Sequence, residues 1–453
     1  MIRKIKRLSA ALLLAAGINM PGILSLVRVD GPKTALLLIC SAFFFLYANI
    51  LPPTGNRKGV SADTGRLRQL SKGSALILYA GIACLAGLVC SLVSFREIPE
   101  WTAGRVLQYV FSILCWLFGS GILLLNGCLR LMTVSVQMGI RYRLLLFLCW
   151  WIPVVNLFLF YRLYRLAEQE YETEREKEEL NAVRKENECC HTRYPLLMVH
   201  GVFFRDFRFF NYWGRVPGEL LRNGAVIYYG NQQSAASVAV CGRELAERIK
   251  NLVEETGCGK VNIIAHSKGG LDARYAVSKC GAADYTASLT TINTPHRGCF
   301  FADYLLEKAP EGVRRFLAAR YNGALRRLGD NSPDFLSAVT DLTAKACLTG
   351  NENLPDCPSV YYQSVATSMK KARSGRFPLN MSYHLVKHFD GENDGLVSVE
   401  SALWGNVYAI LRPKGKRGIS HGDMIDLNRE NFPEFDVREF YVNLVRDLKE
   451  KGY

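Results

Sequence analysis

The chain has 453 residues, enough for two or three domains that each bury a core. It holds 56 Lys and Arg against 41 Asp and Glu, but the excess lies at one end. Residues 1–165 contain 18 basic and 4 acidic residues, whereas the remainder contains 38 and 37. This distribution excludes the broadly basic surface of a nucleic-acid-binding protein. A basic, apolar third before a neutral remainder is typical of a membrane region with flanking charges.

The N-terminal third contains apolar runs, each close to the roughly 20 residues that cross a bilayer as a helix. There are five of them: 8–27, 34–51, 74–95, 106–129 and 144–161. The first is not interpreted as a signal peptide, because no small-residue cleavage site follows it and further apolar runs do. The runs also lack the charged faces that helices of a soluble domain would show. We therefore predict a transmembrane helical region over residues 1–165 and an integral protein of the cell membrane.

Basic residues in the loops predict the orientation of this region. Residues 1–7 hold four of them and the loop 52–73 holds five, whereas the loops 28–33 and 96–105 hold two each. The positive-inside rule places the first two segments in the cytoplasm. With five crossings, everything after residue 165 is expected on the extracytoplasmic side.

The fifth apolar run, 144–161, decides on which side of the membrane the rest of the chain lies. Its residues Trp150, Trp151 and Pro153 also suit an interfacial or re-entrant segment. If that run does not cross, the rest of the chain faces the cytoplasm.

The next stretch, 166–187, is densely charged and has high helix propensity. We predict a charged helical linker over residues 166–190, solvated and leading away from the membrane. No protein partner is implied by it.

From residue 191 to 453 the pattern changes to short apolar strands that alternate with amphipathic helices. YPLLMVHG, GAVIYYG and VNIIAHS have the pattern of buried strands, and a helical pattern lies between the last two. This β-α-β-α order predicts a mostly parallel sheet flanked by helices. Ligand sites in such sheets form at the carboxyl ends of the strands.

The cysteines form no C-x-x-C pair, and no histidine lies at zinc-finger spacing from two of them, so a structural zinc is not expected. Cys347 and Cys357 close a short loop and could pair in an oxidising compartment. Free thiols are an equally consistent interpretation.

A nucleophile elbow is predicted at Ala265-His266-Ser267-Lys268-Gly269-Gly270, directly after the strand VNIIA. Such an elbow needs a strand, a sharp turn at the serine and small neighbours that let the turn close. Ala265 stands where glycine is usual, and it is the next smallest residue. The alternative, a serine that only caps a helix, would explain none of the motifs downstream.

Acyl transfer also needs two N–H donors aimed at the developing oxyanion. The backbone N–H of Lys268 would supply one, and that of Val202, after the strand YPLLMV, would supply the other. His200, in the same His-Gly-Val segment, is expected to have a structural role.

The serine hydroxyl needs a base, and a buried carboxylate must orient that base. In hydrolases that carry such an elbow on a mostly parallel sheet, the catalytic residues follow one another along the chain in the order serine, acid, histidine. Asp394 in GENDGLVS and His421 in GISHGD follow that order. Asp390 is the rival acid, whereas His384 and His388 precede the acid and do not fit.

Five segments together resemble the bacterial triacylglycerol lipase family of the α/β-hydrolase superfamily: YPLLMVHGVFF, VNIIAHSKGG, INTPHRG, NDGLVSVESALWG and SHGDMID. The resemblance covers roughly residues 194–450. It implies that Ser267, Asp394 and His421 form the triad and that Val202 and Lys268 form the oxyanion hole. It also implies a mobile helical lid, over residues 300–345, and a structural role for His296.

The family often carries a structural calcium, and Asp423 matches one of its ligands. No partner aspartate precedes Asp394 at the required place, so no cofactor is expected to be required.

These patterns together predict a membrane-anchored serine hydrolase that cleaves carboxylic esters of lipids through an acyl-serine intermediate. An acyltransferase with a lipid or glycan acceptor would use the same residues. A membrane protein with a degenerate hydrolase domain is a third hypothesis, against which the intact motifs argue.

Overall fold

The structure, a computed structural model, describes residues 2–27, 31–54, 65–97, 102–202, 211–327 and 332–453. The chain divides into two compact units, Met1–Val183 and Arg184–Tyr453. The first unit is helical and the second contains a β-sheet with helices on its faces, and each has its own buried apolar clusters.

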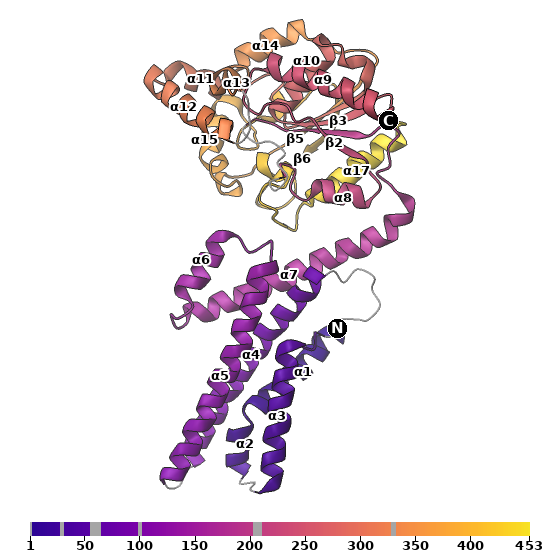
Figure 1. Ribbon diagram of the computed structural model, residues 1–453. Helices are drawn as coiled ribbons and strands as arrows, with labels where there is room; N and C mark the ends of the chain where they lie inside the picture. Colours follow the sequence, from indigo (N-terminus) through magenta and orange to yellow (C-terminus); the bar gives the residue numbers. More distant parts are fainter. Residues whose placement is uncertain (1, 28–30, 55–64, 98–101, 203–210, 328–331) are drawn as a thin grey trace. The chain divides into compact units, whose positions relative to one another are not determined.

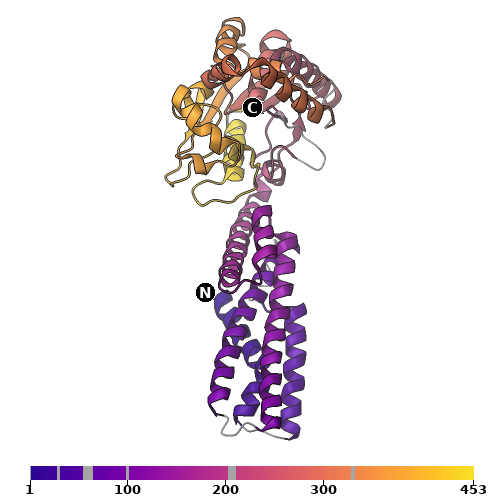
Figure 2. The same cartoon turned by 90° about the vertical axis from the view of Figure 1, so that its left-hand side faces the viewer.

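The first unit contains long helices that run alongside one another in both views (Figure 1 and Figure 2). The closest packing joins α4 to α5 and to α1. The described helices are α1 (Ile2–Ile18), α2 (Met20–Val27), α3 (Pro32–Ile50), α4 (Gly65–Glu97), α5 (Ala103–Val134), α6 (Ile140–Cys149) and α7 (Val155–Arg184).

By length and composition, α3, α4 and α5 are each able to cross a membrane. The pair α1 and α2, bent by 66°, makes up to a fourth candidate. Within the described residues no fifth candidate is found, because the apolar run 144–161 is divided between α6 and α7. The break contains Pro153 and Val154, and Val154 has a φ of 66°. The sequence thus predicts five crossings where the structure has at most four candidates.

Polar contacts bring several helix ends together. The buried Arg7 of α1 donates to the carbonyl oxygens of Ser71 in α4 (2.7 Å) and of Thr54 after α3 (2.9 Å). It also pairs with Glu168 of α7. The start of α1, the end of α3 and the start of α4 therefore lie at the same end of the unit as the charged part of α7.

A second set of contacts adds the end of α5 to this group. Arg66, at the start of α4, pairs with Glu170 of α7 and donates to the carbonyl oxygen of Val134 at 3.1 Å. Glu170 also accepts the N–H of Val136 at 2.9 Å. Arg57 and Lys58, which belong to the basic loop singled out in the sequence, lie outside the described residues.

The stretch 166–187 is helical, as predicted, within α7 and the short η1 (Lys185–Asn187). One face of its first half is buried, however. Glu170 is 1% exposed and Glu174 is 9% exposed, because both pair with Arg66. One face of this part of the helix therefore packs within the helical unit through its acidic residues, and a linker over residues 166–190 stays a prediction.

The second unit contains a six-stranded sheet of the order β2-β1-β3-β4-β5-β6, in which every pairing is parallel. The strands are β1 (Leu196–Val199), β2 (Ile227–Tyr229), β3 (Val261–His266), β4 (Thr286–Ile292), β5 (Tyr361–Thr367) and β6 (Asn406–Leu411). The order reverses at β1, so the loops after β1 and β3 lie beside the point where ligand crevices form in such sheets. The predicted α/β-hydrolase class of fold is confirmed.

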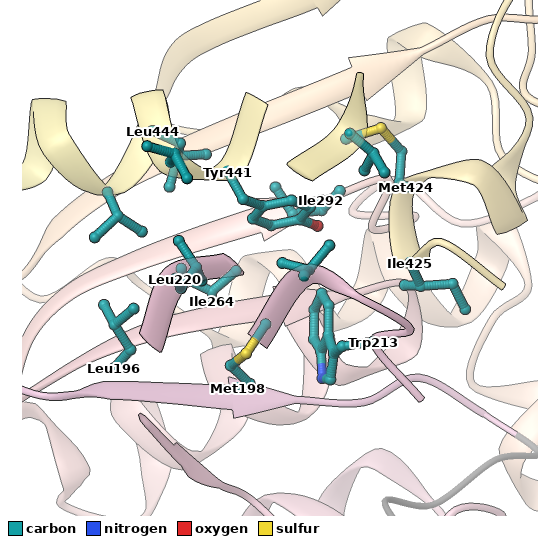
Figure 3. Close-up of a cluster of buried hydrophobic side chains, with 14 of the residues drawn as sticks. Leu196, Met198, Trp213, Leu220, Ile264, Ile292, Met424, Ile425, Tyr441 and Leu444 are labelled. Atoms are coloured by element: carbon teal, nitrogen blue, oxygen red, sulfur yellow. The ribbon is translucent and has the colours of Figure 1, made fainter. Parts of the chain in front are cut away.

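Alternate residues of the strands supply two cores. On one face, Leu196, Met198 and Ile264 pack with α8 (Val216–Arg222) and α17 (Val437–Glu450), as Figure 3 shows around Trp213 and Tyr441. On the other face, Leu197, Val199 and Ile263 pack with α9 (Val238–Thr256) and α10 (Lys268–Lys279). This two-residue period is the one expected of strands with both faces covered.

The segment predicted as a lid is mostly helical where it is described, with short breaks between its helices, and residues 328–331 of it lie outside the described residues. It contains α11 (Phe300–Lys308), α12 (Glu311–Arg327), α13 (Phe335–Thr340) and the start of α14 (Ala344–Asn353). The remaining helices are α15 (Leu379–Asp390) and α16 (Val399–Ala402), and the short η2 (Ala282–Tyr285), η3 (Ala372–Ser374) and η4 (His421–Ile425).

Candidate active site

Ser267 occupies the sharp turn between β3 and α10, with φ 55° and ψ −133°. A non-glycine residue in this left-handed region is strained, and such strain is typical of functional turns. At the two glycines that follow Lys268, there is no room for a side chain. A Cβ on Gly269 would lie 2.3 Å from the carbonyl oxygen of His200, and one on Gly270 would lie 2.1 Å from Oγ1 of Thr294. The two glycines therefore bring α10 close to the neighbouring strand ends, as the sequence predicts.

The loop after β1 reaches this turn. A Cβ on Gly201 would lie 2.9 Å from the Cβ of Ser267, so the backbone before Val202 passes directly beside the serine. Val202 is buried in a cluster with Ala235, Leu325 of α12 and Ala338 of α13. The helices predicted as a lid therefore pack against the predicted oxyanion loop.

His200 has the structural surroundings that the sequence suggests. It is fully buried, and its two ring nitrogens lie 2.8 Å from the carbonyl oxygen of Gly201 and 3.0 Å from that of Gln232. The Gln232 side chain in turn donates to the His200 carbonyl oxygen at 3.0 Å. These bonds fix the loop that leads to Val202.

Asp394 and His421 lie in direct contact. Oδ2 of Asp394 is 2.7 Å from Nδ1 of His421, and both side chains are buried. Oδ1 of Asp394 accepts the backbone N–H groups of Leu396 (2.8 Å) and Val397 (2.7 Å). A carboxylate held in this way keeps the proton on Nδ1, so that Nε2 is left free to act as a base.

His421 lies beside the nucleophile elbow. Its ring centroid is 4.5 Å from that of His266, the residue before Ser267. Nδ1 of His266 lies 2.7 Å from the hydroxyl of Tyr212. Burial, and then the neighbouring His421, hold the pKa of His266 well below its usual value of 6.5. A neutral His266 adds no positive charge next to the imidazole of His421.

Asp390 is placed elsewhere. Its carboxylate accepts the backbone N–H groups of Phe300 (2.9 Å) and Phe301 (3.2 Å) and thus caps the N-terminus of α11. His296, another buried residue, stacks on Trp404 at 5.3 Å and contacts Oγ1 of Thr291 at 2.9 Å. These contacts give both residues structural partners, and none of them joins either residue to the predicted elbow.

Asp423 does not offer a calcium site. Its two oxygens accept from Arg417 at 2.8 and 3.0 Å, and one of them also accepts the N–H of Ser420 at 2.8 Å. Calcium takes six to eight oxygen ligands. The described residues contain no group of three or more His, Cys, Asp or Glu that could hold a metal ion. The residues around Asp423 therefore do not fit the calcium that the resemblance implies.

Sequence reasoning missed a buried ion pair next to the predicted nucleophile, Ser267. Nζ of Lys268 lies 2.7 Å from Oδ1 of Asp272, one helical turn further along α10. Burial raises the pKa of Asp272 to about 6, against the opposing effect of Lys268. The spacing of four residues was the signal that could have revealed this pair. It also missed Arg417, whose contact with Asp423 no motif marks.

Cys347 and Cys357 are both free thiols in the structure. Their sulfurs contact different backbone carbonyl oxygens, that of Pro295 at 3.4 Å for Cys347 and that of Val277 at 3.8 Å for Cys357.

Comparison with known proteins gives matches to a serine esterase family model and to triacylglycerol lipases. A family model described as "Putative serine esterase (DUF676)" matches residues 222–307. A triacylglycerol lipase of Pseudarthrobacter phenanthrenivorans is 36% identical over 177 residues, which cover 36% of this chain and 54% of that protein. One of Pseudomonas fragi is 28% identical over 299 residues, covering 59% of this chain and 99% of that protein.

The chain spans about half the length of the first curated relatives that it matches. Among solved structures, the Staphylococcus hyicus lipase has 17% identity and a TM-score of 0.46, and the match covers 57% of this chain and 97% of that one. The fold assignment rests on the sheet order described above and not on this likeness.

The sheet topology identifies the second unit as a domain of the α/β-hydrolase fold, its sequence is similar to those of triacylglycerol lipases, and a lipase or esterase class of hydrolase is the function that these matches support.

Proposed function

We propose that the second unit hydrolyses carboxylic esters of lipids through an acyl-Ser267 intermediate. The observation that carries the proposal is the 2.7 Å contact between Asp394 and His421, together with the position of the His421 ring beside the residue that precedes Ser267. Lipid esters are the substrate class because the relatives are named triacylglycerol lipases.

The reaction has two halves. Nε2 of His421 takes the proton of the Ser267 hydroxyl as its oxygen attacks the ester carbonyl carbon. The N–H groups of Val202 and Lys268 stabilise the oxyanion, and the imidazolium then protonates the departing alcohol. Water, activated by the same imidazole, releases the fatty acid and restores Ser267.

Product analysis tests this function. The full chain in its native membrane should release free fatty acid from lipid esters, and Ser267→Ala should lower that rate by roughly 10⁴-fold or more. Added lipid alcohols separate hydrolysis from acyl transfer, since a transferase would form a new ester in place of fatty acid. Fatty-acid release by Ser267→Ala at the wild-type rate would remove the assignment.

We also propose that the protein is anchored in the membrane by four crossings: α1 with α2, then α3, α4 and α5. The contacts of Arg7 and Arg66 with α7 support an even number, because they place the start of α1 and the charged part of α7 at one end of the helical unit. A fifth crossing would have put them at opposite ends.

An even number of crossings changes the side of the membrane on which the hydrolase is expected. The basic residues near residue 1 and around Arg66 mark the cytoplasmic end by the positive-inside rule. The chain leaves the helical unit through α7 at this same end, so we propose that the hydrolase faces the cytoplasm. The extracytoplasmic placement expected from the sequence depended on a fifth crossing.

The segment between α5 and the charged part of α7 would then enter one leaflet and return. Trp150, Trp151 and Val154 at its turn are 60%, 66% and 76% exposed within the unit. Exposed tryptophans beside an apolar hairpin suit the boundary between headgroups and acyl chains.

A further inference from the structure

The loop that carries His421 contains Arg417, a half-buried arginine with several polar contacts. Both terminal nitrogens of Arg417 donate to the two oxygens of Asp423, at 2.8 and 3.0 Å. Two parallel bonds of this kind fix the direction of a carboxylate as well as its distance. The Asp423 side chain is 4% exposed, so the ion pair lies largely out of water.

Asp423 is coupled to the backbone that precedes His421. One of its oxygens accepts the N–H of Ser420 at 2.8 Å, while the Ser420 side chain accepts the N–H of Asp423, which together form a capping box. This box starts η4, whose first residue is His421. The orientation of Asp423 therefore sets the start of the short helix that carries the imidazole.

Arg417 itself is anchored on both sides. Its carbonyl oxygen accepts the N–H of Lys370 at 3.1 Å, which ties the loop to the segment that follows β5. Its guanidinium also lies 3.5 Å from Glu430 and 4.1 Å from the ring centroid of Phe432. The Arg417 guanidinium thus connects the segment before η4 with the segment after it.

A second arginine holds the other end of η4. Arg215 donates to both oxygens of Asp426 through its side chain, at 2.7 and 2.8 Å. Cations therefore neutralise the carboxylates at both ends of the segment, and in each case the cation is a protein side chain.

We propose that Arg417 is a positioning residue for His421 and that its guanidinium does the work for which a bound divalent cation would otherwise be needed. It orients Asp423, and through Asp423 and Ser420 it fixes the imidazole against Asp394. The His421 loop therefore needs no metal ion. The inference rests on the proposed function, since it takes His421 as the base.

The test compares variants of the full chain in detergent micelles. Arg417→Met removes the cation and keeps an unbranched side chain, and Arg417→Lys keeps the charge without the paired bonds. The matched control is Arg184→Met. Arg184 makes a similar two-bond pair with Glu439 at 3.0 and 2.7 Å and is 22% exposed against 23% for Arg417.

We expect Arg417→Met to lower kcat per labelled active site by between about tenfold and a hundredfold, because small misplacements of a catalytic group have that cost. KM should stay within about twofold, and Arg417→Lys should recover only part of kcat. Arg184→Met should lower the melting temperature but not kcat. Wild type should keep its activity within about twofold after EDTA treatment, and added Ca²⁺ should change nothing.

Two results would overturn the inference: wild-type kcat in Arg417→Met, or loss of wild-type activity in EDTA with recovery in Ca²⁺. If Arg417→Met does not fold, Asp423→Asn removes the same ion pair with little change of shape and is expected to lower kcat in the same range. Ester hydrolysis and fluorophosphonate labelling of the wild type are measured in parallel. Their absence would mean that the proposed function fails, whereas their presence with an unaffected Arg417→Met would refute only the role of Arg417.

Discussion

The two carboxylic acids near the histidine loop differ in what their oxygens accept. Asp394 contacts Nδ1 of His421, whereas Asp390 caps α11 through two backbone N–H groups. Asp394→Asn should therefore leave the imidazole in the wrong tautomer and lower kcat by roughly 10⁴-fold. Asp390→Asn should weaken a helix cap, at a cost of about 0.5–2 kcal/mol in the free energy of unfolding, with kcat within about tenfold of wild type. Steady-state kinetics and thermal unfolding of both variants measure this, and the reverse ranking of kcat would transfer the role to Asp390.

Single candidate residues could be selected from the sequence where a local pattern marks them. Ser267 follows a strand and precedes two glycines, and the order of Asp394 and His421 along the chain selects them from several candidates. Arg417 could not be found in this way, because its importance comes from a contact with Asp423 that no spacing rule announces. The motif around Asp423, which suggests a calcium ligand, likewise gives no sign of the arginine that contacts both of its oxygens.

Among the elements, the start of α10 has the least free space. A Cβ on Gly269 would lie 2.3 Å from a backbone oxygen of His200, which cannot move aside without shifting the loop to Val202. We expect Gly269→Ala to lower the free energy of unfolding by about 1–3 kcal/mol and to lower kcat as well. Gly218→Ala in α8 is the control, because a Cβ there meets nothing within 4 Å. Chemical denaturation measures the stabilities of the two variants, and steady-state kinetics measures their kcat. Equal stabilities would contradict the close approach of Gly269 to the carbonyl oxygen of His200.

Strands β1, β2 and β3 and helices α9 and α10 were predictable because their periodicity is local and strong. The break in the run 144–161 was not predictable from the sequence. Its apolar residues continue across the turn at Trp150–Val154, so the run has the composition of a single span. The charged stretch after it has the composition of a solvated helix. Glu170 is nevertheless buried, since its partner Arg66 comes from a helix about a hundred residues earlier.

For the whole molecule, the four crossings that we propose would put residues 1–7 and the hydrolase on the same, cytoplasmic side. Protease added to intact cells should therefore leave the hydrolase uncut, and inverted membrane vesicles should expose it to cleavage. A tag after Tyr453, detected by immunoblotting, reports the fragment in both preparations. Cleavage of the hydrolase in intact cells would mean an odd number of crossings and would restore the extracytoplasmic placement.

The central claim is that Ser267 is a nucleophile activated by His421, and covalent labelling tests it most directly. The full chain in its native membrane is treated with a fluorophosphonate probe, and the modified peptide is identified by mass spectrometry. The account predicts that the probe is attached to Ser267, that Ser267→Ala is unlabelled, and that His421→Ala is labelled at least about a hundredfold more slowly. Ester hydrolysis that continues without any label on Ser267, or labelling that persists in Ser267→Ala, would contradict it.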